Sequence, residues 1–72
     1  MNLRKDLKQL RREAGLSRFQ LARKLDITPG SIYNWENGKV KPSADAIYKM
    51  AQIFNITTDD IFLALSTIKV VN

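Results

Sequence analysis

The sequence predicts an all-α domain made of five short helices, and three observations support this prediction. Along most of the chain, apolar residues recur at intervals of three and four, the spacing that places them on one face of a helix. Serine or threonine precedes most of these segments at positions typical of helix N-caps, and glycine or asparagine follows several of them. The length of 72 residues is sufficient for one small domain with a single core.

Apolar stripes define the first two predicted helices. Leu3, Leu7 and Leu10 lie at positions i, i+4 and i+7, and basic residues surround this stripe. Gly15 follows and suits the left-handed conformation that commonly ends a helix. Ser17 is a natural N-cap for the second helix. The inward face of that helix consists of Leu21, Ala22 and Leu25.

The other three helices are defined mainly by their first residues. Thr28 caps the third helix, and Pro29 occupies its first position, where the missing N–H costs nothing. Ser43 introduces the fourth helix and Thr57 the fifth, in which two acidic residues favour the first turn. Asn37 and Gly38 end the third helix. The inward face of the fourth helix consists of Ile47, Met50, Ala51 and Phe54.

Residues 1–65 are therefore expected to form one helical domain, followed by a C-terminal tail over residues 66–72. The tail has no clear helical pattern. Ile68, Val70 and Val71 are compatible either with an extended segment or with a frayed end.

Composition excludes several classes of function. The chain has no cysteine and no histidine, so it lacks thiolate ligands, imidazole ligands and the usual general base. Its seven carboxylates fall mainly at predicted caps and on solvated faces, and no phosphate-binding glycine loop or nucleophile–base arrangement is visible. We therefore expect no enzymatic activity, no metal and no cofactor. No signal peptide is visible, and the longest apolar run, residues 61–65, is too short to span a membrane, so a cytoplasmic protein is expected.

The net charge of +5 is unevenly distributed. Residues 1–41 hold ten of the twelve basic residues and four of the seven acidic residues, whereas residues 42–72 are close to neutral. A basic half beside a neutral half suggests a surface turned toward a polyanion. A generic solubilising surface would give the same asymmetry. The spread of charge over several elements argues against a basic membrane-binding helix.

A very short link joins the second and third predicted helices. Only Asp26 and Ile27 lie between Leu25 and the cap residue Thr28, so the two helices must cross steeply, as they do in a helix-turn-helix unit. Six positions that such a unit requires to be apolar or small carry suitable residues, and six such matches rarely arise together by chance. They are Leu21, Ala22, Leu25, Ile27, Ile32 and Trp35.

Residues 3–65 resemble the small five-helix DNA-binding domains of the phage repressor/Cro family, also called XRE-like. The segments that match the family pattern in order and spacing are LKQLRREAGLS, LARKLDIT, SIYNWENGKVKPS and MAQIFNITTDDIF. The most specific of them contains WENGK at residues 35–39, followed by Pro42 and Ser43. The resemblance implies a compact lambda-repressor-like fold with the helix-turn-helix at helices 2 and 3.

The resemblance also implies how such a domain meets DNA. The third helix would lie in the major groove, while the start of the second helix touches the backbone. In the family, the residue matching Glu36 commonly pairs with the residue matching Arg11. We interpret this pair as structural, although Arg11 is also a candidate for a phosphate contact. The candidates for phosphate contacts are Arg11, Ser17, Arg18, Thr28, Lys39 and Lys41.

The third helix departs from the family pattern at its start. Pro29 and Gly30 stand where the family usually has long polar side chains, Arg18 replaces a common glutamine, and Asp26 replaces a common glycine in the turn. We interpret Pro29 as a good helix start. Gly30 either shares that role or lets the backbone approach DNA closely. The candidates that remain for reading base edges are Ser31, Tyr33 and Asn34.

Phe19 is a second departure, because the family usually has a polar or small residue at this position. It lies off the buried stripe of the second helix. It either packs back over the first helix or, together with Tyr33, forms a protein-docking surface.

The sequence therefore predicts a sequence-specific, DNA-binding transcriptional regulator of the Cro/repressor type, acting in a phage or mobile-element genetic switch. The expected working form is a homodimer on double-stranded operator DNA in the cytoplasm of a bacterial host cell. The alternative is a modulator or antirepressor that binds a cognate repressor protein through its helix-turn-helix face.

Overall fold

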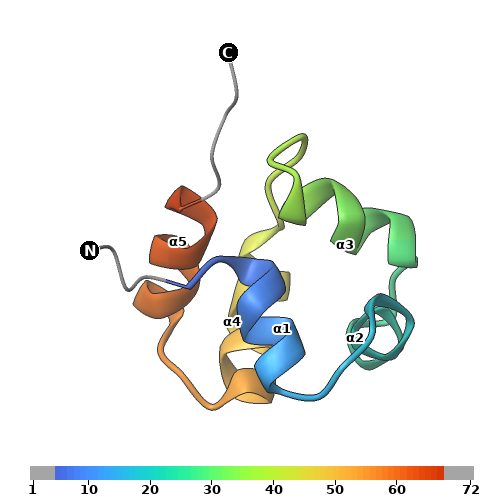
Figure 1. Cartoon of the computed structure of the whole chain (residues 1–72), viewed down its shortest axis with the longest axis horizontal. Coiled ribbons are helices and arrows are strands. Elements are labelled where there is room, and N and C mark those ends of the chain that lie inside the picture. The colour runs from blue at the N-terminus through green and yellow to red at the C-terminus, as the bar shows by residue number, and fades with distance from the viewer. Residues whose placement is uncertain (1–4, 68–72) are drawn as a thin grey trace.

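The five predicted helices are all present in the computed structural model, which describes residues 5–67 (Figure 1). In chain order they are α1 (Leu7–Glu13), α2 (Arg18–Leu25), α3 (Pro29–Glu36), α4 (Ala44–Phe54) and α5 (Thr58–Ser66). Residues 5–67 form no strand. The predicted all-α, five-helix fold is confirmed.

Short polar side chains cap four of the helices at the predicted residues. At Ser17, Thr28, Ser43 and Thr57 the side-chain oxygen accepts a hydrogen bond from the backbone N–H three residues later. Pro29 occupies the first position of α3, where its lack of an N–H removes no helical hydrogen bond. Local sequence therefore determines where each of these helices begins.

α1 begins later than the apolar stripe suggested. Asp6 is its N-cap: the Asp6 carboxylate accepts from the Gln9 backbone N–H at 2.9 Å, and the Gln9 side chain accepts from the Asp6 N–H at 2.8 Å. The helix therefore starts at Leu7, and Leu3 lies outside the described residues. The cap is not evident from the sequence, because the regular leucine spacing continues on both sides of Asp6.

Two helices end in non-glycine residues with a left-handed backbone. Asp26 after α2 and Asn55 after α4 both have a φ of 58°. Aspartate and asparagine tolerate this conformation better than most residues, so Asp26 can replace the usual glycine of the turn. The Ile27 N–H donates to the Ala22 carbonyl at 3.0 Å, and α3 then starts at Pro29. After this turn the chain changes direction, so that Figure 1 shows α2 nearly end-on while α3 runs across the view.

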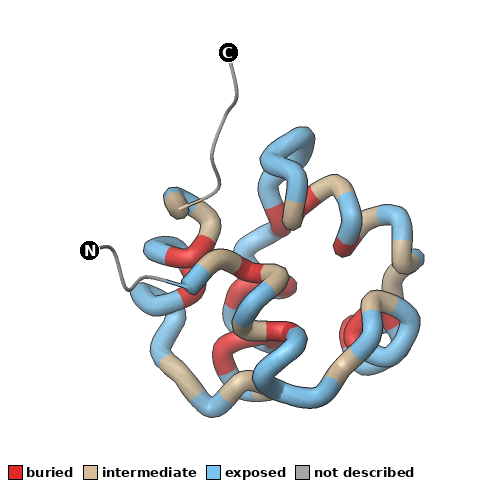
Figure 2. Tube along the Cα trace, in the orientation of Figure 1, coloured by how far each residue is buried: buried red, intermediate tan, exposed pale blue. Residues whose placement is uncertain are grey.

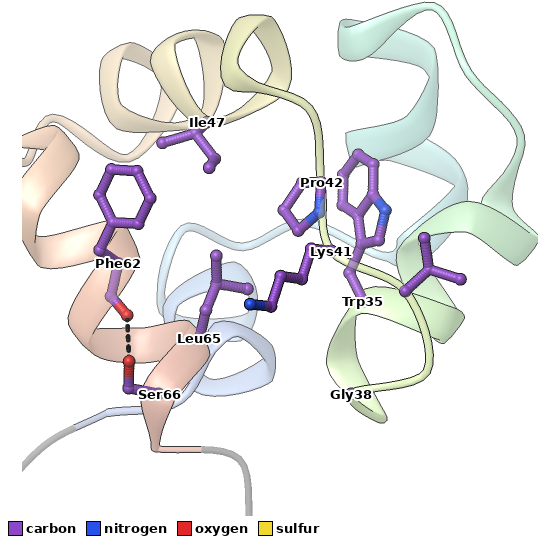
Figure 3. A pocket seen from close by; sticks show the side chains of 9 residues that line it. Trp35, Gly38, Lys41, Pro42, Ile47, Phe62, Leu65 and Ser66 are labelled. Carbon is purple, nitrogen blue, oxygen red and sulfur yellow. Dashed lines mark hydrogen bonds between the residues drawn. The ribbon is translucent and has the colours of Figure 1, made fainter.

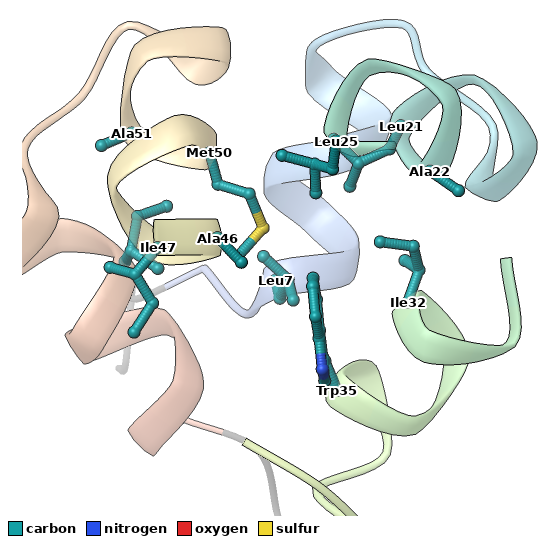
Figure 4. Close-up of a cluster of buried hydrophobic side chains, with 11 residues drawn as sticks. Leu7, Leu21, Ala22, Leu25, Ile32, Trp35, Ala46, Ile47, Met50 and Ala51 are labelled. Carbon is teal, nitrogen blue, oxygen red and sulfur yellow. The ribbon is translucent and has the colours of Figure 1, made fainter. Parts of the chain in front are cut away.

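The helices surround a single core. α2 and α3 lie side by side at one end of the molecule, α4 and α5 pack together at the other, and α1 contacts both α3 and α5 (Figure 1). Each helix presents buried positions toward the interior (Figure 2). Trp35 points from α3 into this cluster (Figure 4). One fully buried side chain comes from each helix in turn: Leu7, Leu21, Ile32, Met50 and Ile61.

α4 agrees with the prediction in its inward face, and α5 runs slightly further than the predicted domain limit. Ile47, Met50 and Ala51 are buried, and Phe54 is half-buried against the core. α5 continues through Ser66 to its cap at Thr67, one residue past the predicted domain limit. The residues of the tail on which the alternatives rested, Ile68, Val70 and Val71, lie outside the described residues.

Candidate nucleic-acid interface

α3 presents a polar face on the side opposite its two buried residues, Ile32 and Trp35. Tyr33 is exposed on this face, whereas Ser31 and Asn34 are half-buried. All three predicted base readers thus reach the surface of the same helix, but to different extents.

The two smaller candidates differ in their hydrogen bonds. The Ser31 hydroxyl lies 3.2 Å from the Thr28 hydroxyl, so it is engaged with the N-cap of its own helix. The Asn34 backbone carbonyl accepts from the Lys39 N–H at 2.9 Å. Within residues 5–67 the Asn34 side-chain amide has no hydrogen-bond partner. Its donor and acceptor pair therefore remains available for a base edge, and adenine presents the matching pair in the major groove.

A buried carboxylate joins three helices behind α3. Glu36 accepts from the Nε of Arg11 at 2.6 Å and from the Nε of Arg18 at 3.0 Å. Arg11 also donates from a terminal nitrogen to the Leu16 carbonyl at 2.9 Å. The Glu36 side chain is only 2% exposed, so two guanidinium groups compensate one buried negative charge. The predicted structural link between the first and third helices is present, and α2 joins it through Arg18.

The Arg11 side chain is consequently not available for the predicted phosphate contact. It is 7% exposed, and its guanidinium donates to Glu36 and to the Leu16 carbonyl. A phosphate could reach it only after this buried pair had been broken, which is costly because an uncompensated buried charge would remain.

Arg18 and Lys39 both approach the ring of Tyr33. The guanidinium carbon of Arg18 lies 5.2 Å from the ring centroid, and the Lys39 Nζ lies 5.6 Å from it. Both distances fall within the range of cation–π attraction. Arg18 precedes α3 in the sequence and Lys39 follows it. The packing of α2 against α3 brings Arg18 to the ring that Lys39 also approaches.

The remaining phosphate candidates occupy three places. Ser17 and Thr28 are the exposed N-caps of α2 and α3. Lys41 is exposed in the segment after α3 and lines an apolar groove of about 380 Å³ between the end of α3 and α5 (Figure 3). The apolar lining of this groove includes Trp35, Val40, Pro42, Ile47, Phe62 and Leu65. Lys41 thus lines this groove, whereas Arg18 and Lys39 approach the ring of Tyr33.

Phe19 does not pack back over α1. Its side chain is 75% exposed, the highest value among the exposed large hydrophobic residues of the described chain. It lines a shallow depression of about 320 Å³ with Leu16, Gln20, Arg23 and Lys24. Phe19 is therefore an exposed surface residue, which is the second of the two alternatives for it.

Gly30 has free space around it. A Cβ atom at this position would meet only the Thr28 hydroxyl oxygen, at an ordinary contact distance of 3.9 Å. Nothing else in the described chain requires glycine here. Its presence at the start of α3 is therefore not explained by packing within the domain.

Other kinds of site are not visible in the part of the chain that the structure describes. Residues 5–67 contain no group of three or more acidic side chains that could hold a metal ion. None of the helices within these residues has the length and apolar character of a membrane-spanning segment.

α2 and α3 are joined by a short turn in which Asp26 has a left-handed backbone, and α3 has a polar outer face with cations beside it. This arrangement defines a helix-turn-helix DNA-binding domain. The family described as "Helix-turn-helix" matches residues 7–61, and the chain belongs to this family, in its XRE-like, phage repressor/Cro-like branch. Its function is accordingly DNA binding in the regulation of transcription.

Known relatives are regulators of transcription. The chain is 34% identical over 59 residues to the HTH-type transcriptional regulator ImmR of Bacillus subtilis, and the match covers 82% of this chain and 46% of that protein. It is 31% identical over 61 residues to an uncharacterised HTH-type regulator of Archaeoglobus fulgidus, with 85% and 87% covered. It is also 31% identical over 61 residues to the transcriptional activator BcrR of Enterococcus faecalis, with 85% and 30% covered. No solved structure matches the chain significantly.

Three contacts at this interface are not evident from the sequence. Arg18 pairs with Glu36, 18 positions away, and the Tyr33 ring is approached by Arg18 and by Lys39, 15 and 6 positions away. The replacement of the common glutamine by Arg18 was the available signal for the first contact. The two contacts with Tyr33 depend on side-chain directions that sequence spacing does not supply.

Proposed function

We propose that this protein is a sequence-specific transcriptional regulator of the Cro/repressor type, which reads an operator with α3. The observation that carries the proposal is the arrangement around α3: Asn34 lies on its outer face with an unoccupied amide, while Arg18 and Lys39 flank it. Base contacts from the helix and phosphate contacts from its flanks are the combination that specific recognition requires.

We further propose that the working form is a homodimer, in the cytoplasm of a bacterial host and in a phage or mobile-element switch. The proposal of a phage or mobile-element switch rests on the resemblance to phage repressor and Cro proteins. The apolar groove beside α5 supports the dimer, because two of its lining residues, Val40 and Phe62, are 53% and 54% exposed. A second copy that covers this surface would remove apolar area from water.

Selection from a random library of duplexes tests this proposal. The purified protein should enrich one sequence, and a dimer should enrich it as an inverted repeat whose half-sites are about one helical turn apart. Enrichment of a single unrepeated half-site would contradict the dimer. Failure to enrich any sequence would contradict specific recognition.

Two substitutions separate base reading from phosphate binding. Asn34→Ala should reduce discrimination at one base position by about 1–3 kcal/mol, because a bidentate contact to a base edge is lost. Lys41→Ala should weaken binding to the enriched and to a mixed-sequence duplex by similar factors, because phosphates carry no sequence information. Competition binding with both duplexes measures the two effects. An unchanged affinity ratio in Asn34→Ala would show that Asn34 does not read a base.

A second candidate function is favoured by the exposure of Phe19. In this alternative the protein is a modulator or antirepressor that binds a cognate repressor through its helix-turn-helix face. An aromatic side chain on α2 that is 75% exposed is typical of the residues enriched in protein interfaces.

Phe19→Ala tests this alternative. Because the side chain is largely in water, the substitution should leave the melting temperature nearly unchanged. If Phe19 anchors a repressor, the complex with that repressor should be lost while the affinity for DNA stays the same. The neighbouring substitution Gln20→Ala is unsuitable as a control because it removes a cap contact, so Arg23→Ala on the same depression is the better comparison. Wild-type partner binding by Phe19→Ala would exclude this anchor.

A further inference from the structure

Tyr33 was expected to read a base, but its surroundings indicate another role. Arg18, at the start of α2, and Lys39, in the turn after α3, place their cationic groups 5.2 Å and 5.6 Å from the centroid of its ring. The ring is therefore the meeting point of two cations from different segments. The face of an aromatic ring attracts cations electrostatically, and more strongly where water is partly excluded.

Arg18 is held from a second side. Its Nε donates to Glu36 at 3.0 Å, and Glu36 is itself fixed by Arg11 at 2.6 Å. The Arg18 side chain is still 34% exposed, and its terminal nitrogens have no hydrogen-bond partner among residues 5–67. The guanidinium is thus held in place at one edge, while the donors at its other edge remain available.

Free arginine and lysine side chains lose rotational freedom when they contact a phosphate. Ordering one such side chain costs about 0.5–1.5 kcal/mol, which corresponds to a factor of about 2 to 12 in affinity. A cation that is already held in its binding position avoids most of this loss. Arginine also offers two parallel N–H donors that match a phosphate, whereas lysine acts as a point charge.

We infer that Tyr33 is a positioning residue, whose ring holds Arg18 and Lys39 as one binding site for the phosphodiester backbone of DNA. This inference rests on the proposed function, because it assumes that α3 enters the groove beside the phosphates that the two cations contact. It assigns Tyr33 a role in affinity for all sequences and leaves Asn34 as the reader. The ring carries this role, and the hydroxyl does not.

The test compares two substitutions of Tyr33 on two probes. The probes are the duplex enriched by the wild-type protein and a mixed-sequence duplex of about three helical turns. Tyr33→Phe keeps the ring and should bind both probes with wild-type affinity. Tyr33→Leu removes the ring and should bind both about tenfold more weakly, with an unchanged ratio between them. Tyr48→Leu, which removes an exposed tyrosine on α4, is the control and should bind as the wild type does. Thermal melting of each variant confirms that the binding assays use folded protein.

A double-mutant cycle tests whether Tyr33 acts through the two cations. In the background Arg18→Gln/Lys39→Gln, where glutamine at position 18 can still donate to Glu36, Tyr33→Leu should cause no further loss of affinity. A further tenfold loss in that background would overturn the inference, as would a selective loss of the enriched duplex in Tyr33→Phe. If the wild type binds DNA and Tyr33→Leu binds equally well, only this inference fails. If the wild type binds neither probe, the proposed function fails with it.

Discussion

Trp35→Ala is expected to leave most of the protein unfolded at room temperature. Trp35 is 7% exposed and points from α3 into the core, so its truncation removes a large buried side chain and leaves a cavity (Figure 4). Substitutions of this kind cost about 3–5 kcal/mol. A chain of 72 residues has little stability in reserve, since native proteins are stabilised by roughly 0.05–0.15 kcal/mol per residue.

Far-UV circular dichroism during urea denaturation measures this effect. It does not depend on tryptophan fluorescence, which this substitution removes because Trp35 is the single tryptophan. Tyr48→Ala is the control, because Tyr48 is 58% exposed and its loss should change the free energy of unfolding little. Equal denaturation midpoints for the two variants would contradict the placement of Trp35 in the core.

Glu36→Gln is expected to be nearly as destabilising, although it removes only a charge. Glu36 is 2% exposed and compensates Arg11, whose side chain is 7% exposed. With a neutral amide at position 36, the buried Arg11 guanidinium would have no countercharge, and such broken buried pairs cost about 3–5 kcal/mol. The amide oxygen can still accept one hydrogen bond, so the lower end of this range is expected.

Glu13→Gln provides a matched comparison on the surface. Glu13 pairs with Lys5 at 2.7 Å, but their side chains are 55% and 50% exposed. Solvent screens this pair, so its loss should cost at most about 1 kcal/mol. The melting temperature of Glu36→Gln should therefore fall much further than that of Glu13→Gln. Equal melting temperatures would show that the buried ion cluster does not stabilise the fold.

Much of the fold was predictable because short-range chemistry determines it. The side chains of Ser17, Thr28, Ser43 and Thr57 satisfy backbone N–H groups only three residues away, so a cap can be recognised without knowledge of the fold. Asp26 similarly adopts the left-handed conformation that its position in the turn requires. The spacing of apolar residues then predicted which side of each helix is buried.

The candidate site was harder to predict because its contacts depend on how helices cross. Arg11 is a reasonable phosphate contact by charge, and only its burial against Glu36 removes it from the surface. Arg18 and Lys39 each had a predicted role, yet their common approach to Tyr33 needs the angle between α2 and α3. The direction of Phe19 was also open, since a large side chain off the buried stripe can either fold back over a neighbouring helix or point into solvent.

The central claim is that the outer face of α3 and the cations near it bind DNA. The dependence of DNA affinity on salt tests this claim most directly. The wild-type protein should be titrated with a mixed-sequence duplex between about 50 and 200 mM salt, a range over which phosphate contacts weaken strongly. Each phosphate neutralised by Arg18, Lys39 or Lys41 should contribute about −0.9 to the slope of log K against log salt, so we predict a slope of about −2.7 or steeper for each protomer. A slope near zero, or no binding at the lowest salt concentration, would contradict the claim that the α3 surface binds DNA.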